Sequence, residues 1–144
     1  MRGIISSVSS KSDYGYTSPT KIIDGSFDHS TYTEFNQICF HSSQSFGEWW
    51  KATFRERVAI VKVHFYNRQD GSSQRSNNLL IIAVTTTNGV TTEKLCANTG
   101  TMENVPDKMF YCETPGTPAD EVKVMNQINN YMNFCELIIY GWVL

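Results

Sequence analysis

The sequence lacks several features that would assign a function class directly. No apolar run approaches the ~20 residues that a membrane-spanning helix needs. There is no basic cluster and the formal net charge is −2, which argues against nucleic acid and anionic membranes as electrostatic partners. The motifs of phosphate loops, Gly-x-Ser-x-Gly nucleophiles and His-Glu-x-x-His metalloproteases are also missing. We therefore expect a protein that is not an enzyme and does not span a membrane.

Long segments with a helical apolar period are also missing, which argues against a helical fold. Short apolar segments take their place. Residues 61–66 alternate apolar with polar side chains, and residues 79–84 are continuously apolar. Asn88-Gly89 follows as a hairpin turn signal. Many short strands joined by turns predict an all-β protein, a β-sandwich, and the length predicts a single domain over residues 1–144.

The sequence has no Cys-x-x-Cys pair, which argues against a zinc site. An even number of cysteines favours two disulfides, although four free buried thiols are the alternative and spacing alone leaves all three pairings open. The N-terminal apolar stretch is too short for a signal peptide, so either such a peptide has been removed or the protein is not secreted. The cysteines are Cys39, Cys96, Cys112 and Cys135.

One polar loop stands between two apolar segments. Residues 67–75 read Asn-Arg-Gln-Asp-Gly-Ser-Ser-Gln-Arg, so Arg68 and Arg75 flank Asp70 in a segment whose Gly and Ser permit tight turns. An arginine offers a rigid fork of donors, and an aspartate can hold that fork in place. The loop is either a solvated hairpin with a surface ion pair or a site for an anion or a hydroxyl-rich neutral ligand.

A histidine upstream gives the loop a pattern. Residues His41, Arg68, Asp70 and Arg75 form the spacing His-x26-Arg-x-Asp-x4-Arg, which resembles the sugar-binding motif of the F-type lectins, the fucolectin family. Further features in the same order match that family over nearly the whole chain. They are Asp24-Gly25, Cys39 two residues before His41, Trp49-Trp50, Asn67-Arg68, Phe134-Cys135-Glu136 and Tyr140-Gly141.

The resemblance implies a jelly-roll β-sandwich, similar to discoidin domains, that binds L-fucose. Arg68, Arg75 and His41 would donate hydrogen bonds to the sugar hydroxyls, and Asp70 would orient an arginine. Many members have two adjacent cysteines after the motif aspartate, where this chain has Gly71 and Ser72. The missing apolar surface would then come from other residues of the pocket wall, for which the candidates are Phe27, Tyr32 and Phe35.

The resemblance also implies the disulfides Cys39–Cys135 and Cys96–Cys112, hence an oxidising, extracellular setting. It further implies a structural calcium ion with Asp24 and Glu136 as side-chain ligands, since Ca²⁺ prefers hard oxygens. Ile38 stands where the family often has serine, so one hydroxyl ligand is missing. The remaining ligands would be the main-chain carbonyls of Lys21, Ser26, Ile38 and Cys135.

The function that follows is a lectin for fucosylated glycans on cell surfaces or glycoproteins. A monosaccharide offers few atoms, so a single site should bind weakly, and an oligomer or tandem repeat would supply avidity. The alternative is a discoidin-like adhesion module that binds a protein or lipid head group and keeps only a vestigial sugar site.

Overall fold

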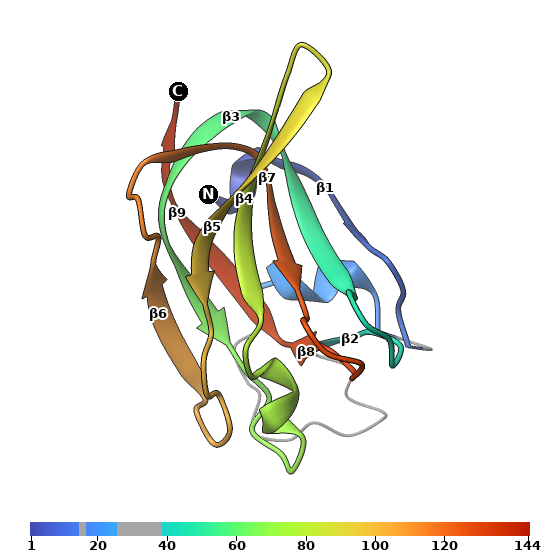
Figure 1. Ribbon diagram of the computed structural model, residues 1–144. Helices are drawn as coiled ribbons and strands as arrows, with labels where there is room; N and C mark the ends of the chain where they lie inside the picture. Colours follow the sequence, from blue (N-terminus) through green and yellow to red (C-terminus); the bar gives the residue numbers. More distant parts are fainter. Residues whose placement is uncertain (15–16, 26–38) are drawn as a thin grey trace.

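The computed structural model describes residues 1–14, 17–25 and 39–144. The regular elements in these ranges are strands and short 3₁₀ helices (Figure 1). The expected all-β fold is confirmed. The elements are η1 (Arg2–Ile4), β1 (Ile5–Ser10), η2 (Pro19–Ile23), β2 (Phe40–His41), β3 (Trp49–Tyr66), η3 (Ser73–Ser76), β4 (Leu80–Thr87), β5 (Val90–Asn98), β6 (Asp107–Tyr111), β7 (Thr117–Met125), β8 (Asn133–Phe134) and β9 (Glu136–Val143).

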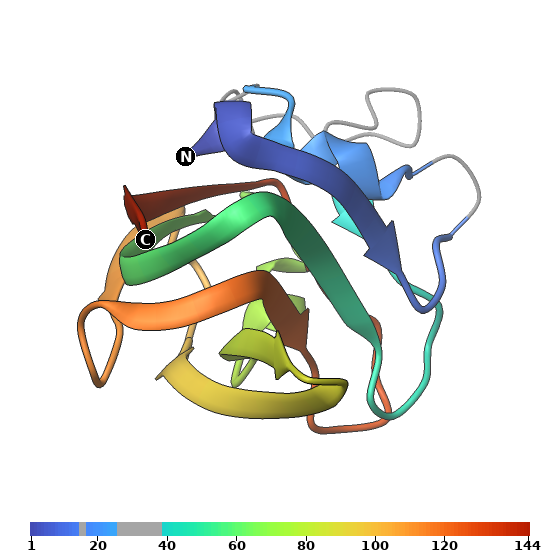
Figure 2. The same cartoon turned by 90° about the horizontal axis from the view of Figure 1, so that it is seen from above.

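The long strand β3 connects the two faces of the sandwich. Its first half pairs with β1 on one side and with β7 on the other, and β7 continues to β4 and β5. Its last part, from Lys62 to Tyr66, pairs with β6 and β9. The register between β3 and β7 shifts between Thr53 and Val58, and such irregularities bend a strand. The antiparallel strands therefore wrap around a common interior (Figure 2).

The core follows from the alternation of side chains along β3. Of the two adjacent tryptophans, Trp50 is fully buried and Trp49 is half-buried, as a strand requires. The ring of Phe134 lies 5.7 Å from Trp50 and 5.0 Å from Phe65, so the short strand β8 is fixed to the same core. Burial of each such side chain contributes about 1.5–3 kcal/mol.

The turn predicted at Asn88-Gly89 joins β4 to β5. Asn88 has φ of 53° and Gly89 has φ of 77°, the left-handed backbone that a two-residue hairpin turn needs and that asparagine and glycine tolerate best. No helix in the described ranges is long and apolar enough to cross a membrane.

Both predicted disulfides are confirmed. Cys39–Cys135 links the residue before β2 to the residue between β8 and β9, and Cys96–Cys112 links β5 to the end of β6. All four cysteines are therefore paired, and the alternative of four free thiols is wrong. The Cys39–Cys135 bond fixes β2 at one end of the sandwich. The helix η3 lies at this same end, and the tip of the β4–β5 hairpin lies at the opposite end (Figure 1).

Candidate functional site

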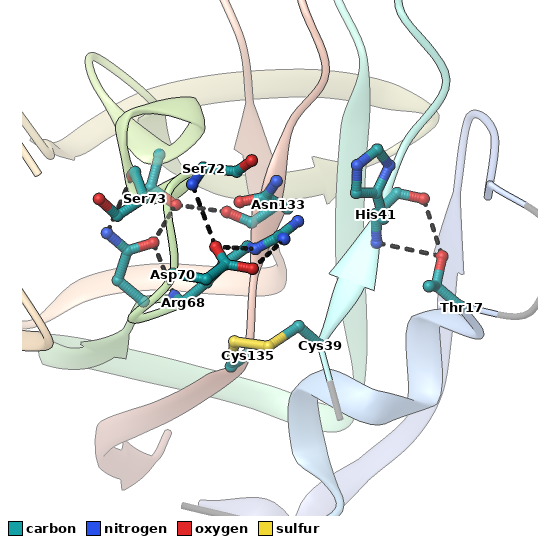
Figure 3. Close-up of a disulfide and its surroundings, with 11 residues drawn as sticks. Thr17, Cys39, His41, Arg68, Asp70, Ser72, Ser73, Asn133 and Cys135 are labelled. Carbon is teal, nitrogen blue, oxygen red and sulfur yellow. Dashed lines mark hydrogen bonds and ion pairs between the residues drawn. A yellow bond between two sulfur atoms is a disulfide. The ribbon is translucent and has the colours of Figure 1, made fainter. Parts of the chain in front are cut away.

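The ladder between β2 and β8 places His41. In this two-residue ladder Phe40 pairs with Phe134 and His41 pairs with Asn133. The two phenylalanines are fully buried, with ring centroids 6.1 Å apart. Because side chains alternate along a strand, His41 and Asn133 face away from these phenylalanines. Figure 3 shows the Cys39–Cys135 disulfide beneath this ladder.

Asn67 organises the loop that carries the arginines. It is fully buried, and its side-chain amide donates to the carbonyls of Ser73 at 3.0 Å and Met102 at 2.9 Å. Its Oδ1 accepts from the Arg68 N–H at 2.9 Å and from the Ser76 hydroxyl at 2.7 Å. These four bonds span both ends of η3, so they fix the short helix on which Arg75 lies.

Asp70 holds the guanidinium of Arg68. Arg68 is only 5% exposed, and its Nε donates to Oδ1 of Asp70 at 2.9 Å while its Nη2 donates to Oδ2. The Ser72 N–H donates to Asp70 as well, at 3.1 Å. Burial opposes ionisation of Asp70, but the hydrogen bonds from Arg68 and Ser72 outweigh it and lower the pKa of this carboxyl group. Asp70 is therefore an ionised clamp that sets the plane of Arg68 (Figure 3).

His41 and Arg75 are in direct contact. The His41 ring donates from Nδ1 to the Ser42 carbonyl at 2.8 Å, so its Nε2 carries a lone pair and accepts from Nη1 of Arg75 at 2.8 Å. The pKa of His41 is lowered to about 4, mainly by burial and also by the charges of Arg75 and Arg68, while the bond to Ser42 and the charge of Asp70 oppose the shift. The imidazole is therefore neutral near pH 7, and it presents an acceptor where the sequence predicted a donor.

Three residues near the site were not predicted from the sequence. The Tyr131 ring centroid lies 4.6 Å from the guanidinium carbon of Arg75 and 5.0 Å from the His41 ring. Tyr14 lies 5.3 Å from the His41 ring. Asn133 is fully buried, and neither polar atom of its side chain has a hydrogen-bond partner among the described residues. No motif or spacing identifies these residues, because only the fold brings them beside His41.

The proposed pocket wall is only partly described. Gly71 is exposed and Ser72 is half-buried beside the Asp70 clamp. Phe27, Tyr32 and Phe35 lie outside the described residues, so their role stays a prediction. A depression of about 260 Å³ adjoins Arg68, the only motif residue among its lining residues, which are Arg68, Gln69, Ser73, Asn104 and Pro106.

Glu136, a predicted calcium ligand, is fully buried at the start of β9. Its Oε1 accepts from Nη2 of Arg2 at 2.7 Å, and its Oε2 accepts from the Gly25 N–H at 3.1 Å. The pKa of Glu136 is raised to about 7, mainly by burial and also by the Asp24 carboxylate, while the bond from Gly25 and the charge and bond of Arg2 oppose the shift. Asp24 therefore lies near enough to Glu136 for the charges of the two side chains to interact.

The other predicted calcium ligands are placed only in part. Lys21 lies in η2, which packs against β9, and Cys135 directly precedes Glu136. Ser26 and Ile38 lie outside the described residues. Within the described ranges no group of three or more His, Cys, Asp or Glu side chains could hold a metal ion. The calcium site thus stays a prediction that depends on main-chain oxygens.

Acid is expected to weaken both the fold and the site through His41. Its pKa is lowered from 6.5 to about 4 on folding, so the unfolded chain binds the proton more readily between these values. The free energy of unfolding should therefore fall as the pH drops from about 6.5 to about 4, by at most roughly 3 kcal/mol from this group. Below that range protonated His41 can no longer accept from Arg75.

The measurement is chemical unfolding of the wild type and of His41→Gln at pH 4, 5, 6 and 7. In the variant, the free energy of unfolding should no longer show the fall that His41 causes between about pH 6.5 and about pH 4. Equal pH dependence in both proteins, or an apparent pKa of His41 near 6.5 by NMR, would contradict the assignment.

Comparison with known proteins gives matches at the level of structure. No protein-family model and no curated protein matches the sequence. The fucolectin from striped bass (Morone saxatilis) serum has a TM-score of 0.80 and 20% identity, covering 96% of this chain and 46% of that chain. A fucose-binding module of Streptococcus pneumoniae has a TM-score of 0.77 and 15% identity, covering 98% and 97%. The lectin domain of lectinolysin, in complex with Lewis B antigen, has a TM-score of 0.76 and 18% identity, covering 93% and 91%.

Proposed function

We propose that this chain, which has the fold of the F-type lectins, is a lectin that binds L-fucose at the ends of glycans through His41, Arg68 and Arg75. The observation that carries the proposal is the contact between Arg75 and His41. Nη1 of Arg75 lies 2.8 Å from Nε2 of His41, beside an arginine that Asp70 holds in one plane. Residues of β2 and of the loop after β3 thus converge at one end of the sandwich.

The hydrogen bonds favour a hydroxyl over an anion. A sugar hydroxyl can accept from an N–H of the Arg75 guanidinium, and a hydroxyl that takes the place of Arg75 Nη1 at His41 can also donate to the neutral Nε2, which has a single lone pair. A carboxylate or phosphate oxygen could accept from the arginine, but it has no proton for Nε2. The pair therefore suits a neutral, hydroxyl-rich ligand, which supports the proposal of a sugar over an anion.

The two disulfides are consistent with an extracellular protein, which supports a glycan partner. Two disulfides persist in oxidising compartments, where glycans of cell surfaces and glycoproteins are exposed. One monosaccharide site binds weakly, so we propose that oligomers or tandem copies supply the working affinity.

Calorimetric titration of L-fucose against L-galactose tests the function. L-Galactose differs from L-fucose only by a hydroxyl on the methyl carbon, and burial of an unpaired hydroxyl costs about 1–3 kcal/mol. We expect saturable binding of L-fucose and roughly 5- to 150-fold weaker binding of L-galactose. Absence of L-fucose binding by a folded, calcium-supplied protein would contradict the lectin function and favour an adhesion module with a vestigial site.

We also propose that Ca²⁺ binds at Asp24 and Glu136. A cation stabilises the ionised form of a fully buried carboxyl group beside a second one, and Arg2 supplies a positive charge at Glu136. The Arg2 side chain is 45% exposed, so it can move into solvent when a metal binds. The carbonyls of Lys21, Ser26, Ile38 and Cys135 would complete the ligand set. The ion would tie η2 to the start of β9 and so support β2 and β8 indirectly.

Removal of calcium is therefore expected to lower the melting temperature. An ion that binds only the folded state adds about 2.7 kcal/mol at a hundredfold excess over its dissociation constant. Differential scanning calorimetry with added CaCl₂ and with EDTA measures the effect. Glu136→Gln should lose the response, while Glu121→Gln, which removes a carboxylate paired with Lys51 elsewhere, should keep it. Identical melting curves of the metal-free and calcium-supplied wild type would contradict the proposal.

A further inference from the structure

Tyr14 is an exposed aromatic side chain on a fixed backbone. Its side chain and backbone are 60% exposed, yet its N–H donates to the His41 carbonyl at 2.7 Å. The Thr17 N–H donates to the Tyr14 carbonyl at 3.3 Å, and the Thr17 hydroxyl lies within 3.1 Å of the Tyr14 carbonyl and 2.9 Å of the His41 carbonyl. Tyr14 is thus attached to the same strand, β2, that places the candidate sugar-binding histidine.

The Tyr14 ring continues the surface of the site outward. Its centroid lies 5.3 Å from the His41 ring and 6.2 Å from the Tyr131 ring, which it meets edge to face. Tyr131 in turn packs against the guanidinium of Arg75 and against His41. Arg75 therefore packs against the Tyr131 ring, whereas Tyr14 is more exposed than Tyr131.

We propose that Tyr14 forms a second subsite, which takes the sugar ring next to the terminal fucose of a glycan. This rests on the proposed function of the adjoining site and names its ligand class as fucosylated oligosaccharides. A tyrosine side chain has only two rotatable bonds and loses little conformational entropy when it binds, and its apolar face complements the C–H face of a hexopyranose. Galactose has such a face, because its hydroxyl groups leave one side of the ring with mainly C–H bonds.

The position of the Tyr14 ring determines which ligands should lose affinity when the ring is removed. The hydroxyls of the terminal fucose would bond to Arg75 and His41, and Tyr14 would contact the next sugar without taking part in those bonds. Loss of the ring should therefore lower the affinity for the longer ligand and leave the affinity for the monosaccharide unchanged. Tyr131 differs, because it supports Arg75 and its loss would affect both ligands.

Titrations of L-fucose and fucosyl-lactose into the wild type, Tyr14→Ala and Tyr14→Phe test the subsite. We expect the wild type to bind the trisaccharide roughly tenfold more tightly than L-fucose, Tyr14→Ala to bind both ligands equally, and Tyr14→Phe to behave as the wild type. Tyr111→Ala, which removes a ring that is 63% exposed on β6, is the control and should keep the wild-type ratio.

The outcomes separate the two proposals. If the folded wild type binds neither ligand, the lectin function itself fails. If the wild type binds both ligands and Tyr14→Ala keeps the same ratio of affinities, the second subsite is wrong while the fucose site stands. A fall in L-fucose affinity equal to the fall in trisaccharide affinity would place Tyr14 in the primary site and would likewise overturn the subsite.

Discussion

Replacement of Arg75 by lysine is expected to abolish detectable binding of L-fucose and to leave the fold intact. Arg75 is half-buried, donates to Nε2 of His41 and lies against the Tyr131 ring. Lysine keeps the charge but lacks the planar fork, and a neutral sugar offers no charge to attract a bare ammonium group. Loss of one hydrogen bond from a charged donor costs about 1.5–3 kcal/mol, roughly 10- to 150-fold in affinity.

Arg57→Lys is the matched control for this substitution. Arg57 also forms a two-point ion pair, with Asp120 at 2.9 and 2.8 Å, but it lies near the β4–β5 hairpin away from the site. It should bind L-fucose as the wild type does. Calorimetry measures binding, and circular dichroism checks the fold. Wild-type affinity in Arg75→Lys would exclude Arg75 from the site.

Removal of the Cys39–Cys135 disulfide is expected to have the largest effect on stability and also to impair binding. The two cysteines are 96 positions apart, and in the chain-entropy model a loop of this size contributes about 4.7 kcal/mol. This bond also fixes the residue two positions before His41. A Cys39→Ala, Cys135→Ala double variant should therefore unfold at a lower denaturant concentration and bind L-fucose weakly even where it is folded.

Removal of the second disulfide, Cys96–Cys112, serves as the comparison for removal of Cys39–Cys135. Cys96 and Cys112 are only 16 positions apart, for which the same model gives about 3 kcal/mol, and they lie on β5 and beside β6. A Cys96→Ala, Cys112→Ala variant should lose less stability and should keep its affinity under conditions where it is folded. Equal stability losses, or equal binding in both folded variants, would contradict the role given to Cys39–Cys135.

The fold could be predicted from the sequence because its signals are local. Alternation along residues 61–66, the apolar segment 79–84 and the turn at Asn88-Gly89 each depend on neighbouring residues and on the periods of strands. The disulfide pairing was different. Spacing left three pairings open, and only the resemblance to F-type lectins selected the pairing that the structure has.

The site could be predicted only in its polar part. The motif named His41, Arg68, Asp70 and Arg75, and the Arg68–Asp70 pair forms because its members are two residues apart in one loop. The protonation of His41 was not predictable, because it depends on the Ser42 carbonyl and on burial.

Tyr14 and Tyr131 belong to segments 117 positions apart by their residue numbers, and they meet only because β2 pairs with β8. Arg2 likewise reaches Glu136 across 134 positions. Contacts of this range leave no periodic or spaced signal in the sequence. The same holds for Asn133, whose side-chain amide has no hydrogen-bond partner in the part of the chain that the structure describes.

The most direct test of the central claim is NMR of the arginine Nε–H and histidine ring signals during addition of L-fucose. The account predicts that the signals of Arg68, Arg75 and His41 shift together and saturate with one dissociation constant, while those of Arg2, Arg55 and Arg57 stay in place. Shifts confined to the latter three arginines, or saturation that leaves Arg75 and His41 unchanged, would contradict a fucose site at this end of the sandwich.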